Sequence, residues 1–231
     1  MTELDFVLLT VYFLCVSYVL YQIVNSFNDE FTIRLEQDDL NRYLEAHHLK
    51  DIVGVNFRFD NRYEFDKLKQ LAIRIQNKSE NYLIYVDWDH CVLTDLDGRS
   101  RRVARFSPGG TLDAFQNQVF SIIAPKQTLQ ELISGEDQLA RKGESGFLEV
   151  AKTVIDLSKP DPKKSSEAKR KRYRDFMASQ IKLEFELHLA LRVVGANTAP
   201  TGDRARIVCK LTMIKLDWTA GLPWNPKRKP F

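Results

Sequence analysis

An alternating stretch near the C-terminus reads IKLEFELHLAL over residues 181–191. Every second residue is apolar, so the Ile, Leu and Phe side chains fall on one face, as in a half-buried β-strand. A second stretch, RIVCKLTMIKL at residues 206–216, shows a similar alternation, and residues 195–202 contain the glycines of a connecting loop. The pattern predicts two long strands near the end of the domain.

Shorter strands precede these two. Asp97-Gly98 is typical of a tight hairpin turn, because Gly adopts positive φ at no steric cost. We expect a strand at 52–59, a hairpin made of 71–75 and 82–88 around a polar link at 77–81, a second hairpin made of 91–93 and 102–106, and a strand at 118–123. Such a series of short strands predicts a mainly β fold, an antiparallel immunoglobulin-like sandwich.

The chain divides into four expected parts. Residues 38–47 begin with acidic side chains and place Leu40, Tyr43 and Leu44 at helical spacing, which predicts a short helix. We therefore expect a transmembrane anchor at 1–28, a short helical linker at 29–50, a β-sandwich domain at 51–224 with a basic insertion near 160–177, and a basic tail at 225–231.

The N-terminal segment has no charged residue between Phe6 and Asn28. A helix needs about 20 apolar residues to cross the hydrocarbon core of a bilayer. A transmembrane anchor, a cleaved signal peptide and a buried core helix all remain open. The acidic N-terminal flank and the bulky residues near the end of the segment argue against a signal peptide, and the lack of a polar face argues against a core helix. We expect a single-pass anchor.

The charges flanking the anchor predict its orientation. No Lys or Arg precedes Arg34, and Arg42 follows it, so the basic residues lie on the C-terminal side. Cytoplasmic flanks are enriched in Lys and Arg, which places the large domain in the cytoplasm.

Composition excludes several classes of protein. The net charge is +3, and without the two acids ahead of the anchor the remainder carries 34 bases against 29 acids, or +5, which is too mild to indicate nucleic-acid binding. The three cysteines are scattered, and the four histidines show no metal-binding spacing. We expect no disulfide framework, no metal site and no cofactor.

A basic insertion interrupts the strands. It contains seven Lys and Arg residues within twelve positions, namely Lys163, Lys164, Lys169, Arg170, Lys171, Arg172 and Arg174. We interpret the insertion as a loop or short helix outside the core. Its charges suit a solvated surface, contact with anionic lipid, or contact with nucleic acid or an acidic protein, and they are the candidate membrane-surface or partner-binding residues.

Several motifs resemble uncharacterised bacterial membrane-associated β-sandwich domains. These motifs are IQNKS at 75–79, YVDWD at 85–89, DGRSRRV at 97–103, the strand from Gln118 to Pro125, and LPW at 222–224. The resemblance covers roughly residues 66–224 and implies a sandwich fold, without an assigned activity. The N-terminal span and the basic insertion are departures from this group.

One local motif resembles a different family. The stretch LIYVDWDHC at 83–91 is similar to the opening motif of haloacid-dehalogenase-type phosphatases, in which a hydrophobic strand ends in Asp-x-Asp. The resemblance implies that Asp87 attacks phosphorus and that Asp89 acts as general acid and base, with Mg²⁺ neutralising the phosphate. That fold requires a parallel sheet alternating with helices, whereas the flanking segments here predict hairpins.

The leading hypothesis is therefore a single-pass, membrane-anchored, non-enzymatic interaction or assembly module at the membrane surface. Its expected partners are membrane lipid, through the N-terminal helix, and a protein such as a membrane complex, whereas nucleic acid is disfavoured. The alternative is an Mg²⁺-dependent phosphatase that uses Asp87 and Asp89.

Overall fold

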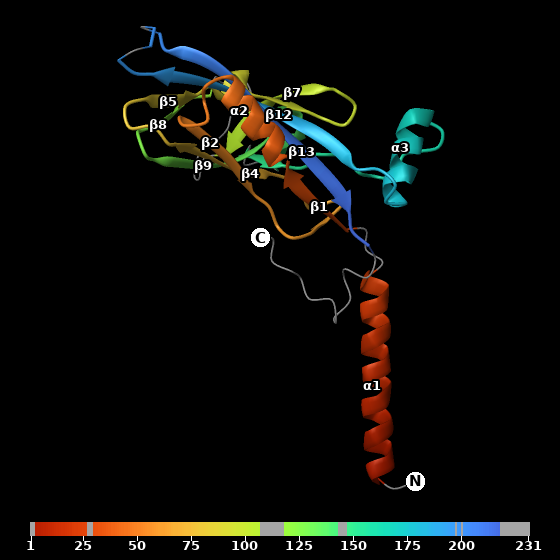
Figure 1. Cartoon of the computed structure of the whole chain (residues 1–231). Coiled ribbons are helices and arrows are strands. Elements are labelled where there is room, and N and C mark those ends of the chain that lie inside the picture. The colour runs from red at the N-terminus through yellow and green to blue at the C-terminus, as the bar shows by residue number, and fades with distance from the viewer. Residues whose placement is uncertain are drawn as a thin grey trace.

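The computed structural model describes residues 3–26, 30–106, 118–142, 147–196, 198–199 and 201–217. A long N-terminal helix projects from a mainly β domain (Figure 1). The expected basic tail at 225–231 and the LPW motif at 222–224 lie outside the described residues. The helices are α1 (Glu3–Ser26), α2 (Gln37–Ala46) and α3 (Glu167–Met177), with short 3-10 turns η1 (Trp88–His90) and η2 (Glu136–Gln138).

The strands are β1 (Glu30–Leu35), β2 (Val53–Arg58), β3 (Tyr63–Glu64), β4 (Leu71–Asn77), β5 (Leu83–Val86), β6 (Val92–Thr94), β7 (Ser100–Phe106), β8 (Ser121–Ile123), β9 (Thr128–Gly135), β10 (Leu139–Lys142), β11 (Phe147–Val150), β12 (Leu183–Val194) and β13 (Asp203–Lys215). Each described ladder is antiparallel. The prediction of a mainly antiparallel β domain is confirmed.

The two long strands form the central hairpin of the domain. β12 and β13 pair from Leu183 opposite Met213 to Val193 opposite Asp203. Alternate residues of β12 are buried, because every second side chain points into the core. Gly202 in the connecting loop has φ +79°, and a Cβ there would lie 2.6 Å from the Val194 side chain, so glycine is required.

One curled sheet, in place of two separate ones, encloses most of the core. Its strand order is β2-β4-β9-β7-β6-β12-β13-β1-β3, and β5 joins it beside β12 and carries β8; β10 and β11 form a separate two-stranded sheet. The sheet curls into two layers, one formed by β2, β4 and β9 and the other containing β6, β12, β13 and β1. β7 links the layers, because Ser100–Arg102 pair with β6 whereas Val103–Phe106 pair with β9. Side chains from both layers, such as Ile75 and Leu189, meet in a single buried cluster.

The hairpin predicted from 71–75 and 82–88 is wrong, whereas the hairpin at Asp97-Gly98 is confirmed. β4 pairs with β2 and β9, and β5 pairs with β12 and β8. The buried side chain of Asn77 explains the difference, since its Nδ2 donates to the carbonyls of Tyr82 (2.7 Å) and Ile123 (3.0 Å). The polar link therefore carries the chain from one layer to the other.

The segment expected to be a linker belongs to the domain. β1 pairs with β13 on one side and β3 on the other, and α2 buries Leu40 and Leu44 in the core. The predicted short helix is present. Its apolar side packs against β13, whereas a free linker would need no amphipathic pattern. The sheet therefore begins at β1, within the segment expected to be a linker.

The N-terminal helix is long and apolar enough to span a membrane. The window from Leu4 to Tyr21 has no residue buried against the rest of the protein. This exposure excludes the core-helix alternative for that window. Ser26 is separated from Glu30 by three residues, a connection that extends at most about 14 Å. The start of β1 therefore lies close to the end of α1.

Candidate membrane-proximal basic site

The pairing register identifies which end of the domain adjoins α1. Phe31 in β1 lies opposite Lys215 in β13, and both Ile33 and Leu183 lie opposite Met213. The start of β12 is therefore at the same end of the sheet as the start of β1. Only five residues separate Met177, the end of α3, from Leu183, the start of β12, and this short connection holds the helix on the α1-proximal side (Figure 1).

Helix α3 is the predicted basic insertion. Its Ser166 N-cap accepts a hydrogen bond at Oγ from the backbone N–H of Lys169 (3.2 Å), which satisfies one of the free donors at the helix start. Phe176 is fully buried and its ring lies 6.2 Å from that of Phe65. The expectation of a loop or short helix is confirmed, but its placement wholly outside the core is wrong, because Phe176 anchors the helix.

Two of the seven predicted basic residues are used in packing α3 against the domain. Lys169 lies 3.7 Å from the carboxylate of Asp156. Arg172 donates to the carbonyl oxygen of Leu96 (2.7 Å) and forms an ion pair with Asp97. Arg170 is half-buried, and its Nε has no hydrogen-bond partner among the described residues.

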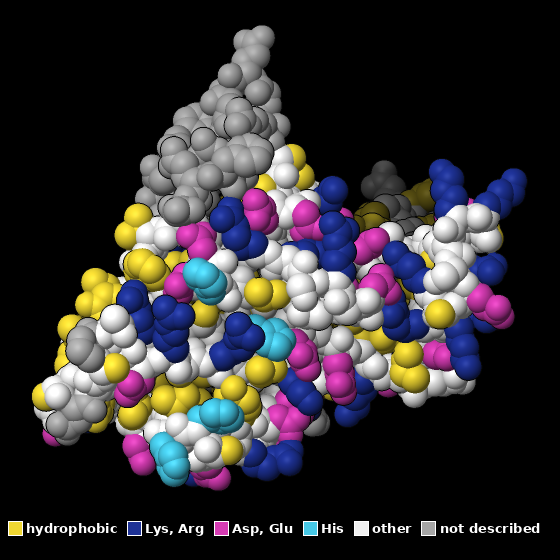
Figure 2. Space-filling model, turned by 90° about the horizontal axis from the view of Figure 1, so that it is seen from above, with side chains coloured by type: hydrophobic (Ala, Val, Ile, Leu, Met, Phe, Trp, Pro, Cys, Tyr) yellow, Lys and Arg dark blue, Asp and Glu magenta, His cyan; other side chains and the backbone are white. Residues whose placement is uncertain are grey.

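The other four predicted basic residues are exposed, namely Lys163, Lys164, Lys171 and Arg174. Within the described part of the chain none of their side chains has an ion-pair partner. Figure 2 shows Lys and Arg side chains gathered on the side of the molecule that carries α3. Lys163 and Lys164 lie in the turn before α3, and Lys171 and Arg174 lie on its exposed side. We call these four residues together the basic face of α3. Unpaired cations on an α1-proximal surface are suited to bind an anionic surface.

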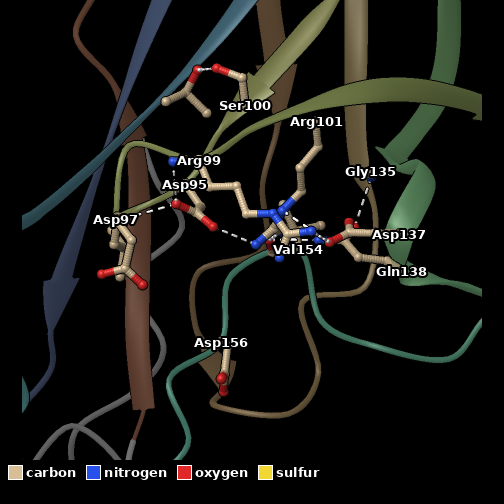
Figure 3. A network of polar contacts seen from close by, with 12 residues as sticks. Asp95, Asp97, Arg99, Ser100, Arg101, Gly135, Asp137, Gln138, Val154 and Asp156 are labelled. Atoms are coloured by element: carbon tan, nitrogen blue, oxygen red, sulfur yellow. Dashed lines mark hydrogen bonds and ion pairs between the residues drawn. The ribbon is translucent and has the colours of Figure 1, made fainter. Parts of the chain in front are cut away.

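A network of ion pairs supports the turn against which α3 rests (Figure 3). Arg101 lies between Asp95 and Asp137, with Nε 3.2 Å from an Asp137 oxygen, and donates to the carbonyl of Val154 (3.4 Å). Asp95 Oδ1 accepts hydrogen bonds from the backbone of Asp97 (2.9 Å) and Arg99 (3.0 Å). Arg101 and Asp95 are largely buried and form an ion pair with each other, and Arg101 Nε has no hydrogen-bond partner among the described residues. A buried ion pair under a turn indicates a structural role.

The Asp-x-Asp motif lies in a similar structural network. Trp88 between the two acids is buried and donates from Nε1 to Ser121 Oγ (2.9 Å). Asp89 pairs with Arg102 (3.2 Å) and accepts from the backbone N–H of Gln118 (3.1 Å). Its oxygens are therefore engaged by the protein's own donors.

The fold around this motif also differs from that of a haloacid-dehalogenase-type phosphatase. β5, which precedes Asp87, pairs antiparallel with β12 and β8, whereas the phosphatase fold needs parallel strands. No group of three or more potential metal ligands occurs among the described residues. The context that the motif requires is therefore not found around Asp87 and Asp89.

A pocket that the sequence did not indicate lies at the opposite end of the domain. It is a cavity of about 520 Å³ between the end of α2 and the β12–β13 hairpin, and its lining includes His48, Arg204 and Arg206. In the sequence, His48 lies more than 150 positions before Arg204 and Arg206, so only the fold brings them together. The one feature of the sequence that points to this pocket is the placement of Arg204 and Arg206 two residues apart, which puts both on the same face of a strand.

No family model, curated protein or solved structure matches this chain.

Proposed function

We propose that this chain is a single-pass membrane protein whose β domain acts as an interaction or assembly module at the membrane surface. The observation that carries the proposal is the three-residue connection between the apolar helix α1 and β1, the first strand of the sheet. So short a connection holds the domain against the bilayer with the β1 end facing it. The function is then to hold the rest of the domain at a fixed distance from the bilayer surface, where a partner binds it.

The cytoplasmic side is the proposed location of the domain. Arg34 and Arg42 follow the span and no basic residue precedes it. Cys91 and Cys209 are free thiols in the buried core, as is common in a reducing compartment. Both observations support the same orientation.

The basic face of α3 is the proposed contact with the membrane. Each Lys or Arg near an anionic leaflet contributes about 1 kcal/mol, so the four residues of the face supply up to about 4 kcal/mol. That contribution falls off within a Debye length of about 8 Å at physiological salt. The proposal therefore requires that the short tether to α1 lets the basic face approach the leaflet this closely.

Extraction of membranes with alkaline carbonate tests the anchor. The full chain is expected to remain in the membrane pellet. Replacing both Leu9 and Leu14 with Arg costs about 6 kcal/mol of insertion free energy, at about 3 kcal/mol for each Arg near the middle of the span, and should release the protein. The matched Leu9→Ala/Leu14→Ala variant should stay in the pellet. Release of the unmodified chain by salt alone would refute the proposal.

A further inference from the structure

The pocket at the membrane-distal end has the size and position of a binding site. Its volume of about 520 Å³ is in the range that holds a small organic ligand. Arg204 in its wall lies eleven residues along β13 from Lys215, which pairs with Phe31 at the α1-proximal end. At about 3.3 Å per residue, the pocket lies about 35 Å along the strand from that end.

One wall of the pocket is an uncovered sheet edge. β13 is paired with β12 along most of its length, but β1 covers its other side only from Leu211 to Lys215. Within the described residues no strand pairs with the second side of Asp203–Cys209. Alternate N–H and C=O groups along this edge therefore face the gap beside α2, and such groups are available to a ligand.

Two cations, Arg204 and Arg206, line this wall. Arg204 and Arg206 are exposed and point to the same side of the strand, being two residues apart. Neither side chain has an ion pair or hydrogen bond within the described part of the chain, in contrast to Arg101, Arg102 and Arg105 of β7, which all pair with carboxylates. The acidic residue of the lining is Asp203, whose carboxylate accepts a hydrogen bond from Ala199 N–H (3.5 Å).

The other walls are aromatic and apolar. Tyr43 and Tyr82 face the pocket together with Leu49 and Ile52, and the ring of His47 stacks on Tyr43 at 4.1 Å. Flat side chains and aliphatic groups suit the body of an organic molecule. Guanidinium groups suit a carboxylate or phosphate, to which they donate paired hydrogen bonds.

We propose that the membrane-distal pocket binds a small organic anion, a carboxylate or a phosphate ester with an aromatic or apolar body. Arg204 and Arg206 hold the anionic group, and Tyr43 and Tyr82 hold the body.

Ligand-observed saturation-transfer NMR on the full chain in nanodiscs of neutral lipid tests this proposal. The probes are phenyl phosphate and benzoate, which distinguish a phosphate from a carboxylate, and phenyl glucoside is the neutral control. Binding of at least one of the two anions, with no transfer to the glucoside, is expected. Equal transfer to the neutral probe, or none to either anion, would overturn the proposal.

A pair of matched variants locates the binding. Arg204→Gln/Arg206→Gln should raise the Kd of the bound anion about tenfold or more, because charge-assisted hydrogen bonds are lost. Arg58→Gln/Arg74→Gln removes the same charge from two exposed strand positions outside the pocket and should leave the Kd unchanged. An equal loss in both variants would show that the anion responds to net charge only, which would contradict a specific site.

Discussion

At the scale of single residues, Asn77 is the most consequential polar side chain of the fold. It is fully buried, donates to two carbonyls on different segments, and accepts the N–H of Ser79 at 3.1 Å. Sequence alone indicated a polar turn at 77–81, because Asn, Lys and Ser are typical of turns. It could not show that the Asn77 side chain bridges two layers, since Ile123 lies 46 residues away.

Asn77→Ala should lower the free energy of unfolding by about 3 kcal/mol, because one buried and one partly buried carbonyl lose their donor, at about 1–3 kcal/mol each. The neighbouring exposed residue supplies the control, since Gln76→Ala should change the free energy by less than about 0.5 kcal/mol. Chemical denaturation of both variants measures the difference. Equal effects of the two substitutions would contradict the bridging role.

Burial raises the pKa of the Cys91 and Cys209 thiols to about 12, from about 9 for an ordinary thiol. Between these values the unfolded chain releases thiol protons that the folded chain retains. The free energy of unfolding should therefore be unaffected by the two thiols below pH 9 and should fall as the pH rises from 9 to 12. Denaturation at a series of pH values should show a shallower fall in Cys91→Ala/Cys209→Ala, whereas Cys15→Ala, in α1, should retain the full slope.

At the scale of elements, α3 shows what a run of charged residues in the sequence predicts and what it does not. The run of Lys and Arg predicted an insertion, and the helix is there. Which cations are paired depends on Leu96, Asp97 and Asp156, residues whose position beside α3 follows from the sheet topology. Phe176 is the single buried aromatic residue of the helix. Its burial was not predicted, because the residues around it in the sequence are mostly charged.

Two arginines of α3 therefore differ in their contribution to stability. Arg172→Gln should lower the free energy of unfolding by about 1 kcal/mol, because it loses hydrogen bonds to Leu96 and Asp97 at a partly exposed site. Arg174→Gln, on the exposed side of the same helix, should change it by less than about 0.5 kcal/mol. Thermal or chemical denaturation distinguishes them, and a larger effect at Arg174 would show that the helix docks differently.

At the scale of the whole molecule, local signals were more informative than long-range ones. The β12–β13 hairpin, the Asp97-Gly98 turn and the apolar helix each depend on neighbouring residues, and all three were predicted. β9 was missed, since TLQELISG alternates only weakly. Its pairing with β4 and β7 joins segments more than 25 residues apart, which periodicity does not specify. Such pairings determine which end of the domain lies beside α1.

We expect the α3 end of the domain to face the bilayer and the β12–β13 loop to face away from it. Fluorophores attached to Ala168→Cys in α3 and to Thr201→Cys in the loop, each in a Cys15→Ala background, test it with a quencher on the lipid headgroups. In nanodiscs the Ala168 label should be quenched, more strongly with anionic than with neutral lipid, and less in Lys171→Gln/Arg174→Gln, whereas the Thr201 label should not be quenched. Equal quenching at both positions, or none at Ala168 with anionic lipid, would contradict the account.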